Sequence, residues 1–284
     1  MSDAEHPEPQ GPSTDEPQPH LARQAILVTL GVYLGYLVLS QLPIPGDVRY
    51  LALVAAFYFL PGWLLRRDPK RQARYQVGPG RVVPDWSWKG ARVAALSIAV
   101  VFPIFVVGFF FFYERVCRGD LRLLGPVLWV EELTPWAGGL SDYLSRLCRP
   151  HQGGLWPEQI RLPASWLAYG GLGGLLAVAV EIFAVALPEE VFHRGYLMSA
   201  LEERWPPKRR ILGARLGFAA VLASFLFAVG HLVGMAEAAR LATFFPALVF
   251  SWLWRRSGSL WAPALFHAAS NLLMAVLIAS TFPT

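Results

Sequence analysis

The chain has 284 residues, of which 55% are hydrophobic and only 16% are charged, and its formal net charge is +5. A soluble domain of this size carries about a quarter charged residues, so the composition excludes an ordinary soluble enzyme. The cations do not form a basic stripe with interleaved aromatic residues, which argues against a nucleic-acid partner. With only two cysteines, the chain cannot build a zinc cluster held by thiolates alone.

Residues 1–20 are rich in Pro, Gln, Asp and Glu without apolar periodicity, so we expect a disordered cytoplasmic tail. Beyond it, the sequence contains several apolar runs of about 20 residues, the length that crosses a bilayer as a helix. The sequence therefore predicts an all-α, polytopic transmembrane helix bundle with about seven spans. Their expected ranges are 24–42, 48–65, 93–113, 166–187, 213–232, 241–254 and 259–281.

The charges between these spans predict how the chain crosses the membrane. Eight Lys and Arg residues against two Asp lie between the second and third spans, so the positive-inside rule places this segment and the N-terminus in the cytoplasm. We expect a multi-pass protein of the inner (plasma) membrane. N-terminal transmembrane helices fill 21–113, and a transmembrane core fills 166–284. Between them, 114–165 is an extracytoplasmic loop, in which 121–130 is expected at the membrane interface as an eighth helical piece.

Both cysteines, Cys117 and Cys148, fall in the predicted outer loop. In an oxidising compartment they can form a disulfide. Two unrelated free thiols are an equally good interpretation of the sequence.

A charged stretch at the end of the predicted fourth span holds Glu189, Glu190, His193 and Arg194. Charged residues are rare inside a bilayer and usually mark function. Pro188 is expected to kink or restart the helix. Glu190 and Arg194 are spaced i, i+4, which predicts a structural ion pair, and Glu189 and His193 have the same spacing.

Three further polar residues lie in later spans, namely His231, His267 and Asn271. Counting along a helix from the flanking cations puts Glu189, His231 and His267 roughly 22, 24 and 16 Å from the cytoplasmic edge. A single histidine in a span is more often an interhelical hydrogen-bond partner than a catalyst. Three segments that deliver polar side chains to a similar depth, towards the outer side, indicate a site.

The residue types suggest water activation. A carboxylate and an imidazole that face one water can make it nucleophilic by general-base catalysis. His267 and Asn271 lie on one helix face and both can donate hydrogen bonds to an oxyanion. No metal is predicted, although zinc held by Glu189, His231 and His267 remains an open alternative because two His and one carboxylate form an open catalytic ligand set.

Three motifs occur in order: Glu189-Glu190-Val-Phe-His-Arg194, Phe227-Ala-Val-Gly-His231 and His267-Ala-Ala-Ser-Asn271. In this respect the chain resembles the CAAX protease and bacteriocin-processing (CPBP) family of glutamic intramembrane endopeptidases, whose pattern is Glu-Glu-x-x-x-Arg, Phe-x-x-x-His and His-x-x-x-Asn. The resemblance covers about residues 166–275.

The resemblance implies that Glu189 and His231 activate the water, that His267 and Asn271 hold the oxyanion, and that Glu190 and Arg194 support the site. It also favours a metal-independent glutamic mechanism. One departure is His193, because the family commonly has an aromatic residue before Arg-Gly. A histidine turned inward here would compete for Glu189 or make a metal site more plausible.

The expected substrate is a membrane-anchored protein or peptide in the lipid bilayer. The family cuts prenylated CAAX tails in eukaryotes, whereas bacterial relatives include bacteriocin-processing or immunity proteins and the myxosortases. We expect processing of a C-terminal sorting signal, as in the myxosortases. Two other classes stay open: a non-catalytic immunity or scaffold protein of the same fold, and a proton-coupled transporter. The paired broken helices of secondary transporters are not evident in the sequence.

Overall fold

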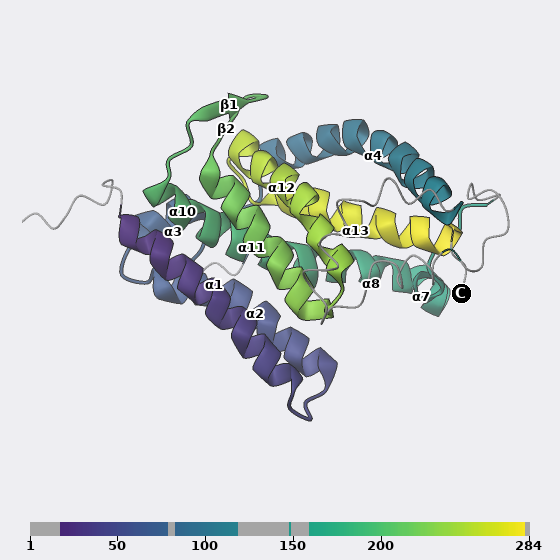
Figure 1. Cartoon of the computed structure of the whole chain (residues 1–284), viewed down its shortest axis with the longest axis horizontal. Helices are drawn as coiled ribbons and strands as arrows, with labels where there is room; N and C mark the ends of the chain where they lie inside the picture. Colours follow the sequence, from purple (N-terminus) through teal and green to yellow (C-terminus); the bar gives the residue numbers. More distant parts are fainter. Residues whose placement is uncertain (1–17, 79–82, 119–147, 149–158, 282–284) are drawn as a thin grey trace, which may run out of the picture.

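The computed structural model describes residues 18–78, 83–118, 148 and 159–281. Nearly all of the predicted tail at 1–20, and all of the predicted interfacial piece at 121–130, lie outside these described residues. Within them, the protein is an all-α helix bundle to which one two-stranded β-hairpin is attached (Figure 1). The predicted fold class is therefore confirmed.

Seven long helical segments lie where the sequence predicts the seven spans. By length and composition, the first, third and last of them are long and apolar enough to cross a membrane. The segments are α1 (Pro19–Ser40), α2 (Gly46–Leu64), α4 (Trp88–Cys117), a continuous helix at 172–204, α11 (Phe218–Met235), α12 (Phe244–Ser257) and α13 (Trp261–Thr281).

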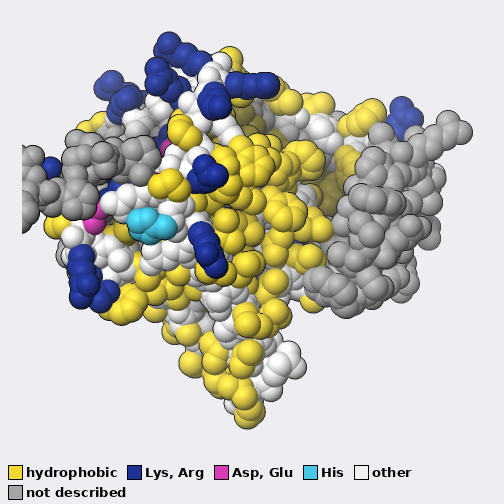
Figure 2. Space-filling view, turned by 60° about the vertical axis from the view of Figure 1, so that its left-hand side comes forward, with side chains coloured by type: hydrophobic (Ala, Val, Ile, Leu, Met, Phe, Trp, Pro, Cys, Tyr) yellow, Lys and Arg dark blue, Asp and Glu magenta, His cyan; other side chains and the backbone are white. Residues whose placement is uncertain are grey.

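The outer surface of the bundle is apolar. Large hydrophobic side chains stay exposed along α1 and α4, for example Leu34, Leu96 and Ile104. Figure 2 shows a broad hydrophobic area over one face, with most Lys and Arg side chains towards its upper and left parts. An apolar belt with charges at its rim is the surface that a bilayer requires.

The helix at 172–204, called the central helix below, lies in the middle of the bundle. It is contacted by α1, α2, α11, α12 and α13. From Ala186 to Leu201 every residue is buried except Glu189, which is partly exposed. The fold therefore surrounds the charged stretch with helices and leaves only Glu189 partly exposed.

The sequence led us to expect that Pro188 kinks or restarts the helix. In the structure, the central helix does not restart there. It runs without interruption as α8 (Leu172–Val180), a π-helical stretch η3 (Glu181–Ala186), α9 (Leu187–Glu190), a second π-helical stretch η4 (Val191–Met198) and α10 (Ser199–Arg204). The wider π turns before and after Pro188 let the chain accommodate a residue without an N–H. The local proline rule is overridden by the surrounding packing.

The predicted fourth span begins six residues too early, because the chain folds back before the central helix. Here α7 (Ala164–Leu167) and the 3₁₀ turn η2 (Ala168–Gly171) precede α8, and Gly171 has a left-handed φ of 92°. A Cβ on Gly173 would lie 2.2 Å from the carbonyl oxygen of Ser165. The chain's own preceding turn thus approaches the central helix closely at Gly173.

The predicted fifth span also starts too early, because a hairpin precedes α11. Strand β1 (Arg209–Ile211) pairs with β2 (Ala214–Leu216) in antiparallel register. The two turn residues, Leu212 and Gly213, both have positive φ, as a type I′ turn requires. Leucine is an unusual residue at such a position, so the sequence carried a weak signal for this turn.

Two short helices complete the described fold. Helix α3 (Pro69–Tyr75) lies in the predicted cytoplasmic segment, with Asp68 capping its N-terminus by accepting from the backbone N–H of Arg71. A 3₁₀ helix, η5 (Ala238–Thr243), joins α11 to α12.

A disulfide joins Cys117, at the end of α4, to Cys148. This resolves the two interpretations that the sequence left open in favour of a bridge. Disulfides persist in oxidising compartments, which agrees with the predicted extracytoplasmic placement of this loop.

Candidate functional site

Three helices bring one carboxylate and two imidazoles together. Glu189 Oε2 lies 3.9 Å from His231 Nε2 and also 3.9 Å from His267 Nε2. Glu189 comes from the central helix, His231 from α11 and His267 from α13. The sequence predicted that these three residues share one depth, and the structure places them side by side.

Hydrogen bonds fix the orientation of both imidazoles. His231 Nδ1 lies 3.1 Å from the carbonyl oxygen of Phe227, and His267 Nδ1 lies 3.0 Å from Glu190 Oε1. A carbonyl or carboxylate oxygen accepts, so each Nδ1 carries the proton. In the neutral rings, both Nε2 atoms then present lone pairs towards Glu189.

The predicted ion pair between Glu190 and Arg194 is present and fully buried. Arg194 Nη1 donates to Glu190 Oε1 at 3.0 Å, and Nη2 donates to the carbonyl oxygen of Ala247 at 3.0 Å. The guanidinium also lies over the rings of Phe227 and Phe250, at 4.5 and 5.0 Å from their centroids. A cation with these partners tolerates burial because a carboxylate, a carbonyl and two aromatic faces offset its charge, although its Nε has no hydrogen-bond partner among the described residues.

Asn271 has a partner that the sequence analysis did not identify. Its Nδ2 donates to Glu181 Oε2 at 3.0 Å, so an acid from η3 holds the amide. Glu181 lies inside the predicted fourth span, and an acid in such a position could have indicated a role in the site. Since an amide nitrogen has two hydrogens, one N–H of Asn271 remains for another acceptor.

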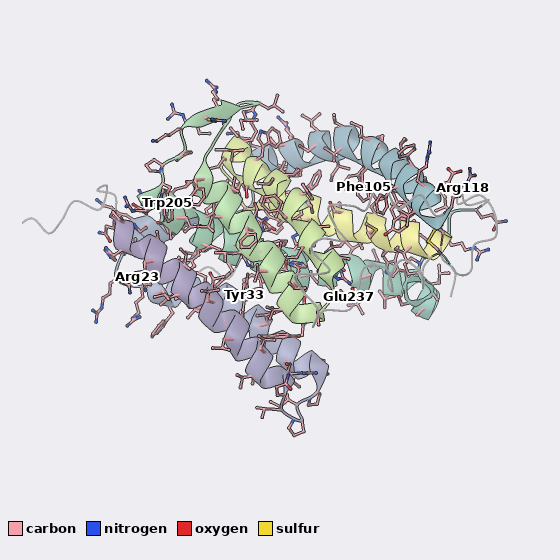
Figure 3. The ribbon with its side chains drawn as sticks, in the orientation of Figure 1. Arg23, Tyr33, Phe105, Arg118, Trp205 and Glu237 are labelled. Carbon is pink, nitrogen blue, oxygen red and sulfur yellow. A yellow bond between two sulfur atoms is a disulfide. The ribbon has the colours of Figure 1, made fainter. Side chains whose placement is uncertain are left out.

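His193 is turned inward, but it does not reach the Glu189 carboxylate. Its Nδ1 lies 2.9 Å from the backbone carbonyl oxygen of Glu189, and its Nε2 lies 2.9 Å from the hydroxyl of Tyr33 on α1. Figure 3 shows Tyr33 on the side of α1 that faces α11. The i, i+4 spacing of Glu189 and His193 therefore gives a hydrogen bond to the backbone of Glu189 and not a pair between the two side chains.

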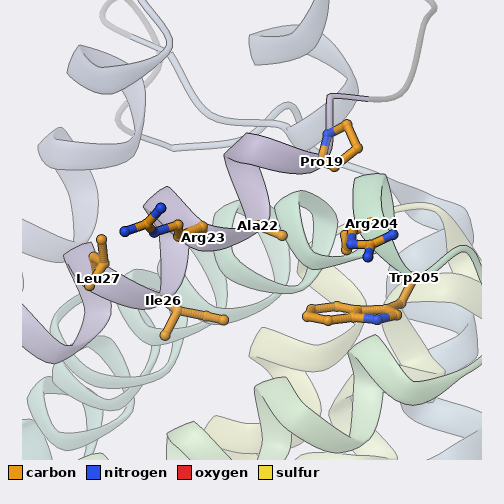
Figure 4. Close-up of a pocket in the computed structure, with 7 residues that line it drawn as sticks. All are labelled: Pro19, Ala22, Arg23, Ile26, Leu27, Arg204 and Trp205. Carbon is orange, nitrogen blue, oxygen red and sulfur yellow. The ribbon is translucent and has the colours of Figure 1, made fainter.

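A small cavity of about 10 Å³ lies beside Glu189, between α2 and the central helix. That is about the space of one water molecule. Glu189 Oε2 is itself buried and has no hydrogen-bond partner among the described residues. A larger pocket, of about 210 Å³, lies far from these groups between the start of α1 and Trp205, and it contains none of the predicted catalytic residues (Figure 4).

Within the described part of the chain, no three His, Cys, Asp or Glu residues are grouped as ligands for a metal ion. Two ligand atoms on a tetrahedral zinc ion lie roughly 3.3 Å apart. Glu189 Oε2 lies 3.9 Å from each of the two Nε2 atoms, so these atoms would have to move closer together to share one ion.

Comparison with models of known protein families gives a match. A family model described as type II CAAX prenyl endopeptidase Rce1-like matches residues 171–273. The matched segment contains all three motifs, from Glu189 to Asn271. No curated protein and no solved structure matches the chain.

Proposed function

Because residues 171–273 form an Rce1-like domain of the CAAX prenyl endopeptidase family, we propose that this membrane protein is an intramembrane endopeptidase that uses Glu189 to activate water. The observation that carries the proposal is the placement of Glu189 Oε2 at 3.9 Å from both His231 Nε2 and His267 Nε2. Three acceptor atoms that face one another repel unless a donor lies between them, and a water molecule supplies two hydrogens.

The proposed reaction is hydrolysis of a peptide bond. The water oxygen attacks the carbonyl carbon, and its proton passes to Glu189, with His231 as the second base. The C–N bond then breaks, and the proton is delivered to the departing amine nitrogen. The products are a new carboxyl terminus and a new amino terminus, so atoms and charge balance without a further reactant.

We assign the oxyanion to His267 and Asn271. His267 donates from Nε2 only when its ring is protonated, and Glu190, which accepts from its Nδ1, stabilises that imidazolium. Asn271 offers the N–H that Glu181 does not hold. Glu190 and Arg194 then act as supports that orient His267.

The proposed substrate is a protein anchored in the same membrane, cut near the membrane end of its hydrophobic segment. Partial exposure of Glu189 within a buried stretch supports entry of an extended chain at this point. Processing of a C-terminal sorting signal is our first choice of substrate class.

The test compares membrane proteins from cells that carry the wild-type chain or Glu189→Ala, by mass spectrometry of terminal peptides. New C-termini found only with the wild type would establish the protease and identify its substrates. Glu237→Gln, a change at an acid in an i, i+3 surface pair, is the control and should cut normally. Identical termini in all strains, with equal protein levels, would favour the non-catalytic immunity or scaffold function.

We also propose that the reaction needs no metal. Purified protein should keep its cleavage rate after treatment with a strong chelator, because carboxylate and imidazole groups supply the base. Activity that is lost with chelator and restored by zinc would contradict this mechanism.

A further inference from the structure

Pro188 removes a hydrogen-bond donor directly before Glu189. In a helix, the N–H of residue 188 would bond to the carbonyl of Ala184 in the α pattern or of Phe183 in the π pattern. Two tyrosines of α2 supply donors instead: Tyr50 donates to the carbonyl oxygen of Ala184 at 2.7 Å, and Tyr58 donates to that of Phe183 at 2.7 Å. The hydroxyls replace the N–H that proline lacks.

A third tyrosine makes the same kind of contact on the helix of His231. Tyr33 of α1 donates to the carbonyl oxygen of Leu226 at 2.8 Å, while its oxygen lies 2.9 Å from His193 Nε2. Gly230 makes room for this ring, since a Cβ there would lie 2.6 Å from the Tyr33 hydroxyl oxygen. Tyr33 therefore connects the helix of Glu189 with the helix of His231.

All three tyrosines come from α1 and α2, which precede the matched segment at 171–273. We propose that Tyr33, Tyr50 and Tyr58 are positioning residues, which hold the backbone around Glu189 and set its separation from His231. The inference rests on the proposed function, and it assigns a role in the site to helices outside the matched domain.

The first test changes each tyrosine to phenylalanine, which removes only the hydroxyl. We expect kcat to fall about tenfold for Tyr50→Phe or Tyr58→Phe, with KM nearly unchanged, because one lost hydrogen bond shifts the base without removing it. Tyr36→Phe is the matched control on α1, since Tyr36 makes no hydrogen bond to a described residue, and it should keep full activity.

The second test uses Pro188→Ala, which restores the missing N–H. In that background the new N–H bonds to Ala184 or Phe183, so the corresponding hydroxyl becomes redundant. Tyr50→Phe or Tyr58→Phe should then cost less, both in kcat and in the thermal unfolding midpoint, than in the wild type.

Two results would overturn the positioning role. One is that the tyrosine variants behave like Tyr36→Phe; the other is that the losses of Tyr50→Phe and Tyr58→Phe are unchanged in the Pro188→Ala background. The unfolding measurement needs no substrate. A wild type that cuts no substrate would therefore contradict the proposed function alone. The coupling between Pro188 and the tyrosine hydroxyls would then be decided by comparing the unfolding midpoints of the single and double variants.

A second, independent observation concerns the hairpin. Arg210 and Arg215 lie directly opposite each other in the register, and like charges in that position are destabilising. Lys208 and Arg209 are exposed beside them, and no carboxylate in the described part of the chain pairs with any of the four. Such a cluster is a candidate binding surface for an anion.

The hairpin also carries an exposed apolar tip. Ile211 and Leu212 are 48% and 81% exposed. Trp252 Nε1 donates to the carbonyl oxygen of Ile211 at 3.0 Å, and Trp252 lies five residues, roughly 7 Å, before the end of α12. Tryptophan at a helix end is typical of the lipid headgroup region, so the tip lies at that depth.

We infer that residues 208–216 bind anionic phospholipid headgroups, with the tip in the interface and the cations on the phosphates. In Figure 2, Lys and Arg side chains gather at the top of the view, the height at which Figure 1 places the hairpin. We favour the bilayer over a protein as the partner because the cations and the apolar tip lie on the same short hairpin.

The test reconstitutes the full chain in nanodiscs of phosphatidylglycerol with phosphatidylethanolamine and measures co-purified phosphatidylglycerol by mass spectrometry. Each removed cation should weaken lipid binding about fivefold, so Arg210→Gln with Arg215→Gln should lose most of the bound lipid. Arg67→Gln with Lys70→Gln, the same charge change elsewhere, should retain it. Equal retention by both double variants would overturn the inference.

Discussion

Glu190 connects the supporting cation of the site with one of its imidazoles. One of its oxygens, Oε1, lies 3.0 Å from both Arg194 Nη1 and His267 Nδ1, so it accepts from a supporting cation and from a catalytic imidazole. All of this occurs without solvent, because Glu190 and Arg194 are fully buried. In such surroundings the removal of one charge costs more than the pair contributes, since the other charge is left alone.

Glu190→Gln should therefore destabilise the protein strongly. We expect a loss of about 3–5 kcal/mol in the free energy of unfolding, because Arg194 would keep its charge without a partner. Thermal unfolding in detergent measures the change. The control is Glu237→Gln at the partly exposed pair with Arg240, where a loss of at most about 1 kcal/mol is expected. Equal losses in the two variants would contradict the role of burial.

At the scale of elements, the two ends of the central helix are held by different contacts: close packing on a glycine at the start and hydrogen bonds to Glu203 at the end. At the start, the preceding turn packs directly on Gly173. At the end, Glu203 accepts from Arg71 at 3.1 Å, Tyr75 at 2.9 Å and the backbone N–H of Gln18 at 3.1 Å. One carboxylate thus joins α3, α10 and the beginning of α1 at the predicted cytoplasmic edge.

Gly173→Ala should destabilise the fold more than Gly174→Ala. The added methyl at 173 would overlap the backbone of Ser165, which cannot move away as a side chain can. At 174 the nearest atom is 3.5 Å away, an ordinary contact. We expect a difference of at least about 1 kcal/mol in unfolding free energy. A lower midpoint for the 174 variant would show that the turn is packed differently.

Glu203 should make stability depend on pH in the acid range. Partial burial raises the pKa of Glu203, but hydrogen bonds from Arg71, Tyr75 and Gln18 outweigh it and hold that pKa below the ordinary 4.5. The stabilisation is then fully present above 4.5 and is lost as the pH falls through the folded-state pKa. Unfolding midpoints of the wild type and Glu203→Gln should converge as the pH falls below about 4. A difference between the two midpoints that grows as the pH falls would contradict the lowered pKa of Glu203.

At the scale of the whole molecule, charge and disulfide lie at opposite ends of the bundle. The hairpin and α3 carry exposed cations at the end where α1 begins. The Cys117–Cys148 bridge lies at the far end of α4. Both features agree with an inward N-terminus and an outward disulfide, which is the orientation that the positive-inside rule predicts.

Thiol labelling in intact cells tests this orientation. After mild reduction, a membrane-impermeant maleimide should label Cys117 and Cys148 from outside, because the reagent reaches only extracytoplasmic groups. Cys117→Ser with Cys148→Ser gives the background. Labelling that occurs only in permeabilised cells would contradict this orientation and indicate the opposite one.

The sequence by itself determined the class of fold, the approximate positions of the long helices, the pair between Glu190 and Arg194, and the grouping of Glu189 with the two histidines. Each of these follows from local periodicity or spacing, which a helix preserves in three dimensions. The catalytic roles of these residues remain predictions.

Only the tertiary structure decided how the charged stretch is held. The unbroken helix through Pro188, the amide of Asn271 on Glu181 and the contact of His193 with Tyr33 all depend on partners far away in the chain. Residues 33 and 193 are 160 positions apart, and no periodicity links them. Neighbouring helices supplied the donors and acceptors that the local sequence lacks, and those interactions outweighed the local preferences of proline and histidine.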